Sequence, residues 1–505
     1  MRSGRPLRRP SGPPCDHGGL VVWRVVAAAI LVSALARPAT GQDADAPPRL
    51  TSRELREDWR ILRAALEEGH GGLYRITPRA EMDGHFDRAG AQLDSGMTAF
   101  DFVRIAAPVV AAIHDGHTRI DLPPAWEVWL AEQPRLFPFR LAFVRSRAYL
   151  HRDYSARGDA PLGAEVLAIN GTAMAALMGP ILARVPSDGH GVTAKYRALE
   201  STITFGRWYT IVFGHTTRYE LLVRTAAGET RRLVEPGLTA AALTERYERR
   251  YPETVAPGPP LALEVDGDVA VLTIRTFERG AYARSGLAFE RALSDALATV
   301  RDRAARHLII DLRGNGGGAD EYGKLVYAHL TERPFVFYRS LEINRASFDF
   351  LRYSETPDLT VPADRIHPND HGTFDLLGHP NLGFQSPVEP IYAGAAIVLI
   401  DGGSFSATSE LLSVMHSNRR AVFVGEESGG AYIGNTSGLS ATITLPNTGV
   451  RVRIPLVRFT MAVPDDERRY RGIVPDHEVI PTIDDILAGT DVVRAFALDL
   501  ARRGR

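Results

Sequence analysis

Cysteine and lysine are almost absent from this sequence, and both absences restrict its chemistry. The single cysteine, Cys15, precedes an apolar run near the N-terminus, so the rest of the chain holds no thiol and forms no disulfide. Among the 59 basic residues, only Lys195 and Lys324 are lysines, and none follows Lys324. The sequence therefore offers very few positions for lysine chemistry.

Charge of one sign and long apolar runs are lacking as well. The formal net charge is −1, so the composition gives no indication of a nucleic acid or an anionic membrane as partner. Apolar residues make up 45% of the chain and charged residues 24%, which is typical of a soluble globular protein. A length of 505 residues suffices for two or three domains.

The first 41 residues have the pattern of an export signal. Arginines precede a largely apolar run over residues 25–36, and Ala39-Thr-Gly41 supplies the small residues of a cleavage site. The run is shorter than the ~20 residues that a spanning helix needs, although a single-pass anchor remains the alternative. We expect a signal peptide, residues 1–41, cleaved near Gly41, and a periplasmic or secreted bacterial protein without further membrane association.

Two regions with different residue patterns, one typical of helices and one typical of strands, follow the predicted signal peptide. Leu55, Trp59, Leu62 and Leu66 recur at spacings of three and four, which predicts an amphipathic helix within a helical N-terminal region, residues 42–130. Residues 131–244 are rich in short strands separated by turns. Within them, residues 162–171 resemble the strand and turn of PDZ domains, which bind peptides by strand addition. The alternative is an ordinary hairpin that ends in an Asn-Gly turn.

Strands and helices alternate in residues 262–490, after a linker over residues 248–260. Such alternation with continuously apolar strands predicts a layered α/β core. The predicted strands cover residues 269–274, 307–312, 395–400 and 421–424, and the predicted helices cover residues 285–305, 320–330 and 407–416.

Two glycine-containing segments of this core carry candidate chemistry. In Ile310-Asp-Leu-Arg-Gly-Asn-Gly-Gly-Gly318 a strand enters a loop whose bare N–H groups suit a phosphate or a developing oxyanion. The loop matches neither the phosphate-binding nor the dinucleotide-binding pattern. In Asp401-Gly-Gly-Ser-Phe-Ser-Ala-Thr-Ser-Glu410 a strand passes through glycines to a serine at a helix start. That serine fits a nucleophile, or an ordinary helix cap.

Together these segments resemble the S41 peptidase family, which includes C-terminal processing peptidases and tricorn-like proteases. Asp311 to Gly318 fits its first motif, Ser404 to Glu410 the second, Val424 to Gly430 the third and Gly472 to Asp476 the fourth. The resemblance implies a core of ClpP/crotonase type, a PDZ-like domain before it, a polypeptide or peptide substrate, and no cofactor or metal. It implies Ser406 as nucleophile, with Ser404 and Ser409 as rivals, and an oxyanion hole formed by the N–H groups of Gly317 and Ala407. It leaves the oligomeric state open.

The base that activates the serine differs between branches of the family. Processing peptidases use a lysine, and Ala431 occupies its position here. The tricorn-like branch uses a histidine, and Asp115-Gly-His-Thr118 resembles its segment, so His117 is the expected general base. The alternatives are a surface loop or a metal site that includes His114, Asp115 and His117.

The acid that orients His117 is harder to assign. Where the tricorn-like branch has a late glutamate, this chain has Arg469, with Glu467 two residues away. We expect Glu426 to take that role.

Two other functions fit parts of the pattern. A non-catalytic protein that retains the fold could bind peptides or apolar ligands and would need no lysine. Acyl-CoA chemistry on a crotonase-like core is disfavoured because CoA is cytosolic and this chain carries an export signal.

Overall fold

The computed structural model describes residues 47–252, 258–466 and 468–503. The predicted signal peptide, part of the predicted linker over residues 248–260 and Glu467 lie outside the described residues. Within the described ranges, no helix is both long and apolar enough to cross a membrane.

The N-terminal region is helical, as its periodicity predicts. Helix α2 (Ser52–Gly69) begins at a capping box in which Thr51 and Glu54 satisfy each other's backbone N–H groups, and Thr98 and Asp101 do the same for α4. The other elements of this region are α3 (Arg79–Gly90), α4 (Ala99–Ala111), β1 (Arg119–Asp121) and α5 (Pro124–Glu132).

The next region is an antiparallel sheet of order β2-β3-β4-β6-β7, with β5 paired to β4. Asn170 and Gly171 both have positive φ, +48° and +77°, which is the conformation of an Asn-Gly hairpin turn between β4 and β5. The elements are β2 (Phe139–Val144), β3 (Arg147–Asp153), β4 (Glu165–Ile169), β5 (Thr172–Ala173), α6 (Met174–Leu182), α7 (Thr193–Leu199), α8 (Thr204–Phe213), β6 (Arg218–Arg224), β7 (Thr230–Pro236) and α9 (Ala240–Arg250).

The core sheet has the order β20-β17-β16-β10-β9-β8 and is parallel except for β8. All four predicted strands and all three predicted helices of this region are present, with ends shifted by a few residues. The elements are β8 (Leu261–Asp266), β9 (Val269–Ile274), α10 (Arg279–Ser285), α11 (Phe289–Asp302), β10 (His307–Asp311), α12 (Asp320–Ala328), β16 (Ala395–Ile400), α13 (Ala407–Ser417), β17 (Val422–Gly425), β20 (His477–Glu478), α14 (Ile483–Ala488) and α15 (Val492–Arg502).

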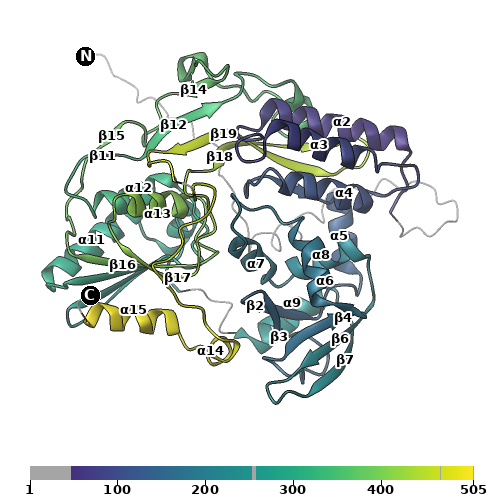
Figure 1. Cartoon of the computed structure of the whole chain (residues 1–505), viewed down its shortest axis with the longest axis horizontal. Helices are drawn as coiled ribbons and strands as arrows, with labels where there is room; N and C mark the ends of the chain where they lie inside the picture. The colour runs from purple at the N-terminus through teal and green to yellow at the C-terminus, as the bar shows by residue number, and fades with distance from the viewer. Residues whose placement is uncertain (1–46, 253–257, 467, 504–505) are drawn as a thin grey trace, which may run out of the picture. The chain divides into compact units, whose positions relative to one another are not determined.

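Helices cover both faces of this sheet, which explains why its strands are apolar throughout. Ile310 and Val398 pack with residues of α11, α12 and α13, whereas Ile309 and Leu399 pack with residues of α15. Figure 1 shows α13 and α15 on opposite sides of β16 and β17.

A second sheet was not predicted. Its order is β1-β19-β12-β14-β13, and β18 also pairs with β19. Strand β1 follows the predicted base and pairs with the C-terminal strand β19, with Ile120 opposite Val452. The elements are β12 (Tyr338–Ile343), β13 (Ile366–Pro368), β14 (Phe374–Leu376), β18 (Thr436–Thr444) and β19 (Arg451–Met461), and β11 (Phe335–Val336) pairs separately with β15 (Phe384–Gln385).

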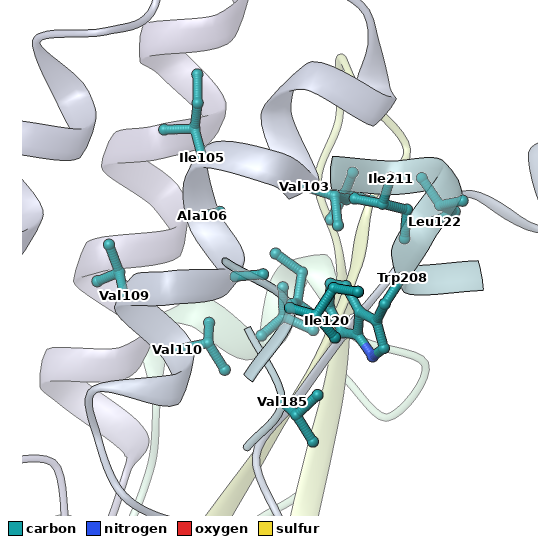
Figure 2. Packing of buried hydrophobic residues seen from close by; sticks show 14 of the residues in the cluster. Val103, Ile105, Ala106, Val109, Val110, Ile120, Leu122, Val185, Trp208 and Ile211 are labelled. Atoms are coloured by element: carbon teal, nitrogen blue, oxygen red, sulfur yellow. The ribbon is translucent and has the colours of Figure 1, made fainter. Parts of the chain in front are cut away.

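One apolar cluster joins the N-terminal helices to this second sheet and to the β-rich region. Figure 2 shows part of this cluster. There, Val103 and Val110 of α4 lie near Ile120 of β1. Trp208 of α8 and Val185, which follows α6, belong to the same cluster. The loop over residues 112–118 leaves this cluster at the end of α4 and returns to it at β1. Its two ends are therefore fixed by the same packing.

Candidate active site

Ser406 stands where β16 has passed through a glycine turn and α13 is about to begin. Its backbone has φ +57° and ψ −128°, which is unusual for a residue with a side chain. Such conformations cost of the order of 1–3 kcal/mol and cluster at functional sites. The Ser406 Oγ lies 3.0 Å from His117 Nε2, although 289 residues separate them in sequence.

The two rival serines have their hydroxyls committed elsewhere. Ser404 Oγ donates to the carbonyl of Leu312 at 2.8 Å, and Ser409 Oγ donates to the carbonyl of Ser404 at 2.9 Å. Both residues are buried. These hydrogen bonds hold the turn around Ser406 and leave Ser406 as the serine that meets the histidine.

The glycine loop after β10 lies directly against Ser406. Gly317 has φ +93°, and a Cβ there would stand 2.7 Å from Ser406 Cβ and 2.9 Å from the backbone nitrogen of Ala407. The Gly317 N–H donates to Asn315 Oδ1 at 3.0 Å, while the Ala407 N–H is the first of helix α13. The structure thus brings both predicted oxyanion donors beside Ser406, with the Gly317 N–H engaged within its own loop.

Asp401 fastens the two glycine segments to each other. Its Oδ1 accepts from the N–H of Gly314 at 2.8 Å and from the N–H of Gly403 at 2.9 Å. Asn315 adds a second tie because its carbonyl accepts from the N–H of Phe405 at 3.0 Å. The nucleophile turn and the glycine loop are therefore joined by hydrogen bonds.

Asp115 shapes the loop that presents His117. Its Oδ1 accepts from the backbone N–H groups of His117 and Thr118 at 2.9 and 2.8 Å and from Thr118 Oγ1 at 2.9 Å, and its Oδ2 accepts from the N–H of Thr436 at 3.2 Å. The imidazole itself stacks on Phe405, with ring centroids 4.7 Å apart. Asp115 thus orders the backbone, and Phe405 supports one face of the ring.

His70 completes the hydrogen bonds beneath this loop. Its Nδ1 accepts from the N–H of Gly72 at 3.0 Å, so its Nε2 carries the proton and donates to Thr118 Oγ1 at 2.7 Å. Burial lowers the pKa of His70, which keeps it neutral and in this role.

The structure does not bring Glu426 to His117. The Glu426 carboxylate forms an ion pair with Arg197, which also pairs with Glu200. A different carboxylate, Asp188, has its Oδ1 3.9 Å from His117 Nδ1, and both side chains are 3% exposed. Sequence analysis missed Asp188, although Asp188-Gly-His190 repeats the tripeptide Asp115-Gly-His117 and could have drawn attention to it.

Three of these side chains also lie close enough together to be considered as metal ligands. Ligand atoms of Asp115, His117 and Asp188 lie within 4.8 Å of one another. Both oxygens of Asp115 already accept hydrogen bonds from the chain, and His117 Nε2 faces Ser406. His114 turns its Nδ1 to the carbonyl of Gly189 at 2.9 Å. This donor set fits hydrogen-bonded acid–base chemistry better than a metal ion.

The sequence position of the processing-peptidase lysine is held by Ala431, which is buried and offers no group that could accept a proton. Ala431 and Asp188 line the same small cavity, together with Arg75. Lys195 donates instead to the carbonyl of Leu182 at 3.0 Å.

Comparison with known proteins identifies the core. The model of peptidase family S41 matches residues 268–479. Among solved structures, mature CPAF is similar at 17% identity with a TM-score of 0.58, covering 90% of this chain and 98% of that chain. Mature CPAF complexed with lactacystin gives 17% identity and a TM-score of 0.59, covering 90% and 99%. At these identities the likeness is one of fold. No curated protein matches the sequence at a significant level.

Proposed function

We propose that this chain is a serine-type peptidase that cleaves peptide bonds through an acyl-enzyme on Ser406, with His117 as general base, and the match of the S41 peptidase family model to residues 268–479 supports it. The observation that carries this assignment is the 3.0 Å contact between Ser406 Oγ and His117 Nε2. A serine hydroxyl is a weak nucleophile until an adjacent base takes its proton.

The steps follow from this contact. His117 Nε2 accepts the hydroxyl proton while Ser406 Oγ attacks the carbonyl carbon of the scissile bond. The resulting oxyanion is stabilised by the Ala407 N–H at the positive end of α13 and by the Gly317 N–H, which would exchange its hydrogen bond to Asn315 Oδ1 for one to the oxyanion. His117 then gives the proton to the leaving amine, and a water molecule activated in the same way releases the acid product and frees Ser406.

Histidine is favoured over lysine as the base because this chain has no lysine at the position that the processing peptidases use. Ala431 cannot accept a proton, and the neighbouring ordered loop carries His117 instead. A neutral imidazole accepts a proton at ordinary pH, whereas a lysine requires a strongly depressed pKa.

The proposal also includes the type of the core, the identity of the β-rich domain and the export of the protein. The parallel core sheet with helices on both faces supports a ClpP/crotonase-type core, and the antiparallel sheet of residues 131–244 supports a PDZ-like domain. The basic and apolar pattern of residues 1–41 supports export to the periplasm or beyond. Expression of the full chain in a bacterium, followed by fractionation and N-terminal sequencing, tests export.

The proposed chemistry is tested by covalent capture with a fluorophosphonate probe and by hydrolysis of casein, using the chain without residues 1–41. We expect labelling and hydrolysis by the unaltered protein, and loss of both in Ser406→Ala and His117→Gln. Ser413→Ala is the matched control, since it removes a buried hydroxyl of the same helix, one that donates within α13 to the carbonyl of Ser409 at 2.9 Å, and should still be labelled. Labelling that persists in Ser406→Ala or in His117→Gln contradicts the assignment.

A further inference from the structure

We propose that His70 is a positioning residue for the general base, on which it acts through the hydroxyl of Thr118. This inference rests on the proposed function, because it concerns how His117 is held beside Ser406. His70 directly follows α2, and its backbone N–H closes the last turn of that helix. Its imidazole contacts the loop of residues 112–118, with Nε2 2.7 Å from Thr118 Oγ1.

The direction of each hydrogen bond in this contact is fixed. The N–H of Gly72 donates to His70 Nδ1 at 3.0 Å, so the ring hydrogen is on Nε2 and is donated to Thr118 Oγ1. The Thr118 hydroxyl keeps its own hydrogen for Asp115 Oδ1, at 2.9 Å. The neutral imidazole is thus the first donor of a chain of hydrogen bonds that ends on the Asp115 carboxylate.

The carboxylate at the end of this chain holds the backbone of the base. Asp115 Oδ1 accepts from the N–H groups of His117 and Thr118 at 2.9 and 2.8 Å. Thr118 is fully buried and donates both its N–H and its hydroxyl to that one oxygen. Fixing the Thr118 side chain therefore fixes the oxygen that accepts from the His117 backbone, and a catalytic group is placed accurately only when such supporting contacts are made.

Two glycines let the backbone around His70 lie directly against the second sheet. A Cβ on Gly71 would stand 2.8 Å from the carbonyl oxygen of Leu456 on β19. A Cβ on Gly72 would stand 2.5 Å from Thr436 Oγ1 on β18. This close packing fixes the backbone from which the imidazole extends.

The same turn also supports the other oxygen of Asp115. The N–H of Thr436, the residue that packs on Gly72, donates to Asp115 Oδ2 at 3.2 Å. His70 therefore acts on Oδ1 through Thr118, and Gly72 lies against the residue that binds Oδ2. The turn after α2 holds the carboxylate from both sides.

Burial keeps the His70 ring in the form that this contact requires. The residue is 1% exposed, and burial lowers its pKa. Asp115, the charged group that faces the ring, has its Oδ1 4.0 Å from Nε2 and opposes this effect. A second ring hydrogen, on Nδ1, would also point at the Gly72 N–H, donor against donor. We therefore expect His70 to be neutral in the folded protein.

His70 is not suited to the other roles of a buried histidine. Its Nδ1 lone pair accepts from Gly72 and its Nε2 carries a hydrogen, so neither nitrogen is available to a metal ion. It is not the base itself, because His117 is the histidine that lies 3.0 Å from Ser406 Oγ. Positioning is the role that its hydrogen bonds support.

The test measures kcat and KM for casein in His70→Asn and Thr118→Val, using the chain without residues 1–41. Asparagine keeps an acceptor near Nδ1 for the Gly72 N–H but does not reach Thr118, and valine has the shape of threonine without the hydroxyl. We expect each change to lower kcat by roughly 10–10²-fold, because small displacements of a catalytic group are costly in rate. KM should stay unchanged, since both side chains are buried and cannot contact the substrate.

Two conservative variants and one double variant separate positioning from a purely structural role. His70→Gln can donate to Thr118 from near the position of Nε2, and Thr118→Ser keeps the hydroxyl, so both should recover most of the rate. In His70→Asn combined with Thr118→Val, kcat should be no lower than in Thr118→Val alone, because His70 acts through that hydroxyl. Two independent structural effects would multiply instead.

His329→Asn is the matched control. His329 is also 1% exposed, and its Nδ1 contacts the carbonyl of Pro390 at 3.0 Å. It follows the C-terminal end of α12, whereas the glycine loop precedes the N-terminal end, so this variant should keep kcat. Tryptophan fluorescence under the assay conditions identifies the variants that are folded, and Thr118→Val, which leaves the ring in place, tests the proposal if His70→Asn does not fold.

The outcomes separate this proposal from the proposed function. If the unaltered chain neither labels with the fluorophosphonate nor hydrolyses casein, the proposed function fails. If it does both and His117→Gln abolishes them, while folded His70→Asn or folded Thr118→Val keeps the kcat of the unaltered chain, only the role of His70 is overturned. The same follows if the losses multiply in the double variant, or if His70→Gln loses as much rate as His70→Asn.

Discussion

The backbone of Ser406 adopts φ +57° although the residue has a side chain, and the surrounding contacts explain how it is held there. The Ser404 hydroxyl donates to the carbonyl of Leu312, and the Ser409 hydroxyl donates to the carbonyl of Ser404 within the turn. Asp401 links the turn to the glycine loop through hydrogen bonds. Strain of this kind persists only where neighbouring structure fixes it. At Ser406 it holds the hydroxyl toward His117 rather than letting the serine act as a helix cap, and no side-chain capping bond from Ser406 is present.

Gly317 provides the clearest residue-scale prediction. In Gly317→Ala the new methyl would stand within 3 Å of Ser406 Cβ and of the Ala407 nitrogen, at a φ of +93°. We expect kcat/KM to fall by at least roughly 10²-fold and the free energy of unfolding to fall by about 1–3 kcal/mol. Casein hydrolysis and urea unfolding measure the two effects.

Gly314→Ala is the control for this prediction. Gly314 lies in the same loop with φ +67°, but a Cβ there meets no atom within 4 Å. It should cost only the ~1–2 kcal/mol of the left-handed backbone and retain most activity. Equal loss of activity in both variants would show that the loop conformation, and not the space beside Ser406, is what matters.

At the scale of elements, a buried carboxyl cluster links the nucleophile helix to its neighbours. The hydroxyl of Tyr338 on β12 lies 2.6 Å from Glu410 Oε2 on α13 and 2.8 Å from Asp320 Oδ2 on α12. One hydroxyl hydrogen cannot serve two carboxylates, so one carboxyl has to be protonated. Burial raises the pKa of both carboxyls, but His379, with its Nε2 3.3 Å from Asp320, opposes this rise at Asp320, so we expect Glu410 to hold the proton.

This cluster predicts a dependence of stability on pH. Burial, and then the Asp320 charge, raise the pKa of Glu410 from 4.5 to about 7 in the folded state. The folded protein therefore binds this proton more tightly than the unfolded chain, and its stability should fall by about 3 kcal/mol as the pH rises from about 4.5 to 7. Glu410→Gln, which mimics the neutral carboxyl, should flatten this fall and be more stable than the unaltered protein at pH 8.

Urea midpoints at pH 5 and pH 8 measure the effect. Glu264→Gln is the control, because Glu264 is exposed, pairs with Arg494 and has a lowered pKa. It should leave the fall between pH 5 and pH 8 in place. An unchanged pH dependence in Glu410→Gln would mean that Glu410 is ionised in the folded protein.

The sequence predicted the core elements because their signals are local. Strands β9, β10 and β16 are short apolar runs bounded by turns, and α2 has a regular apolar spacing. The second sheet lacks such signals. Strand β19 contains Pro455, which argues against a paired strand, and β1 has only three residues. Both are defined by partners far away in sequence.

The site residues likewise fall into those with local sequence signals and those defined by distant partners. Ser406 and the glycine loop could be found from motifs, because each is one continuous segment. The proximity of Asp188 to His117 could not, since Asp188 lies in a polar turn between α6 and α7 and meets His117 only through tertiary packing. Glu426 was expected from its place in a motif, but the fold turns it to Arg197.

At the scale of the whole molecule, the site is assembled from both ends of the described chain. The base comes from the segment after α4, the nucleophile from the core, and β1 and β19 join the two through antiparallel pairing. The largest apolar cluster contains residues of α2, α4 and the β-rich region together with Ile443, Val452 and Leu456 of the β18–β19 pair. Packing that crosses regions in this way should make them unfold together.

The tryptophans allow a direct test, because the four that remain without residues 1–41, Trp59, Trp126, Trp129 and Trp208, all lie outside the α/β region that carries Ser406. Tryptophan fluorescence therefore reports the helical and β-rich regions, whereas fluorophosphonate labelling reports Ser406. In a urea titration of the chain without residues 1–41, we expect both signals to be lost at the same midpoint, since His117 leaves Ser406 when the cluster around α4 opens. Labelling of Ser406→Ala gives the background. Labelling that persists after the fluorescence transition would mean that the core stays active without the N-terminal regions, and His117 could not then be its base.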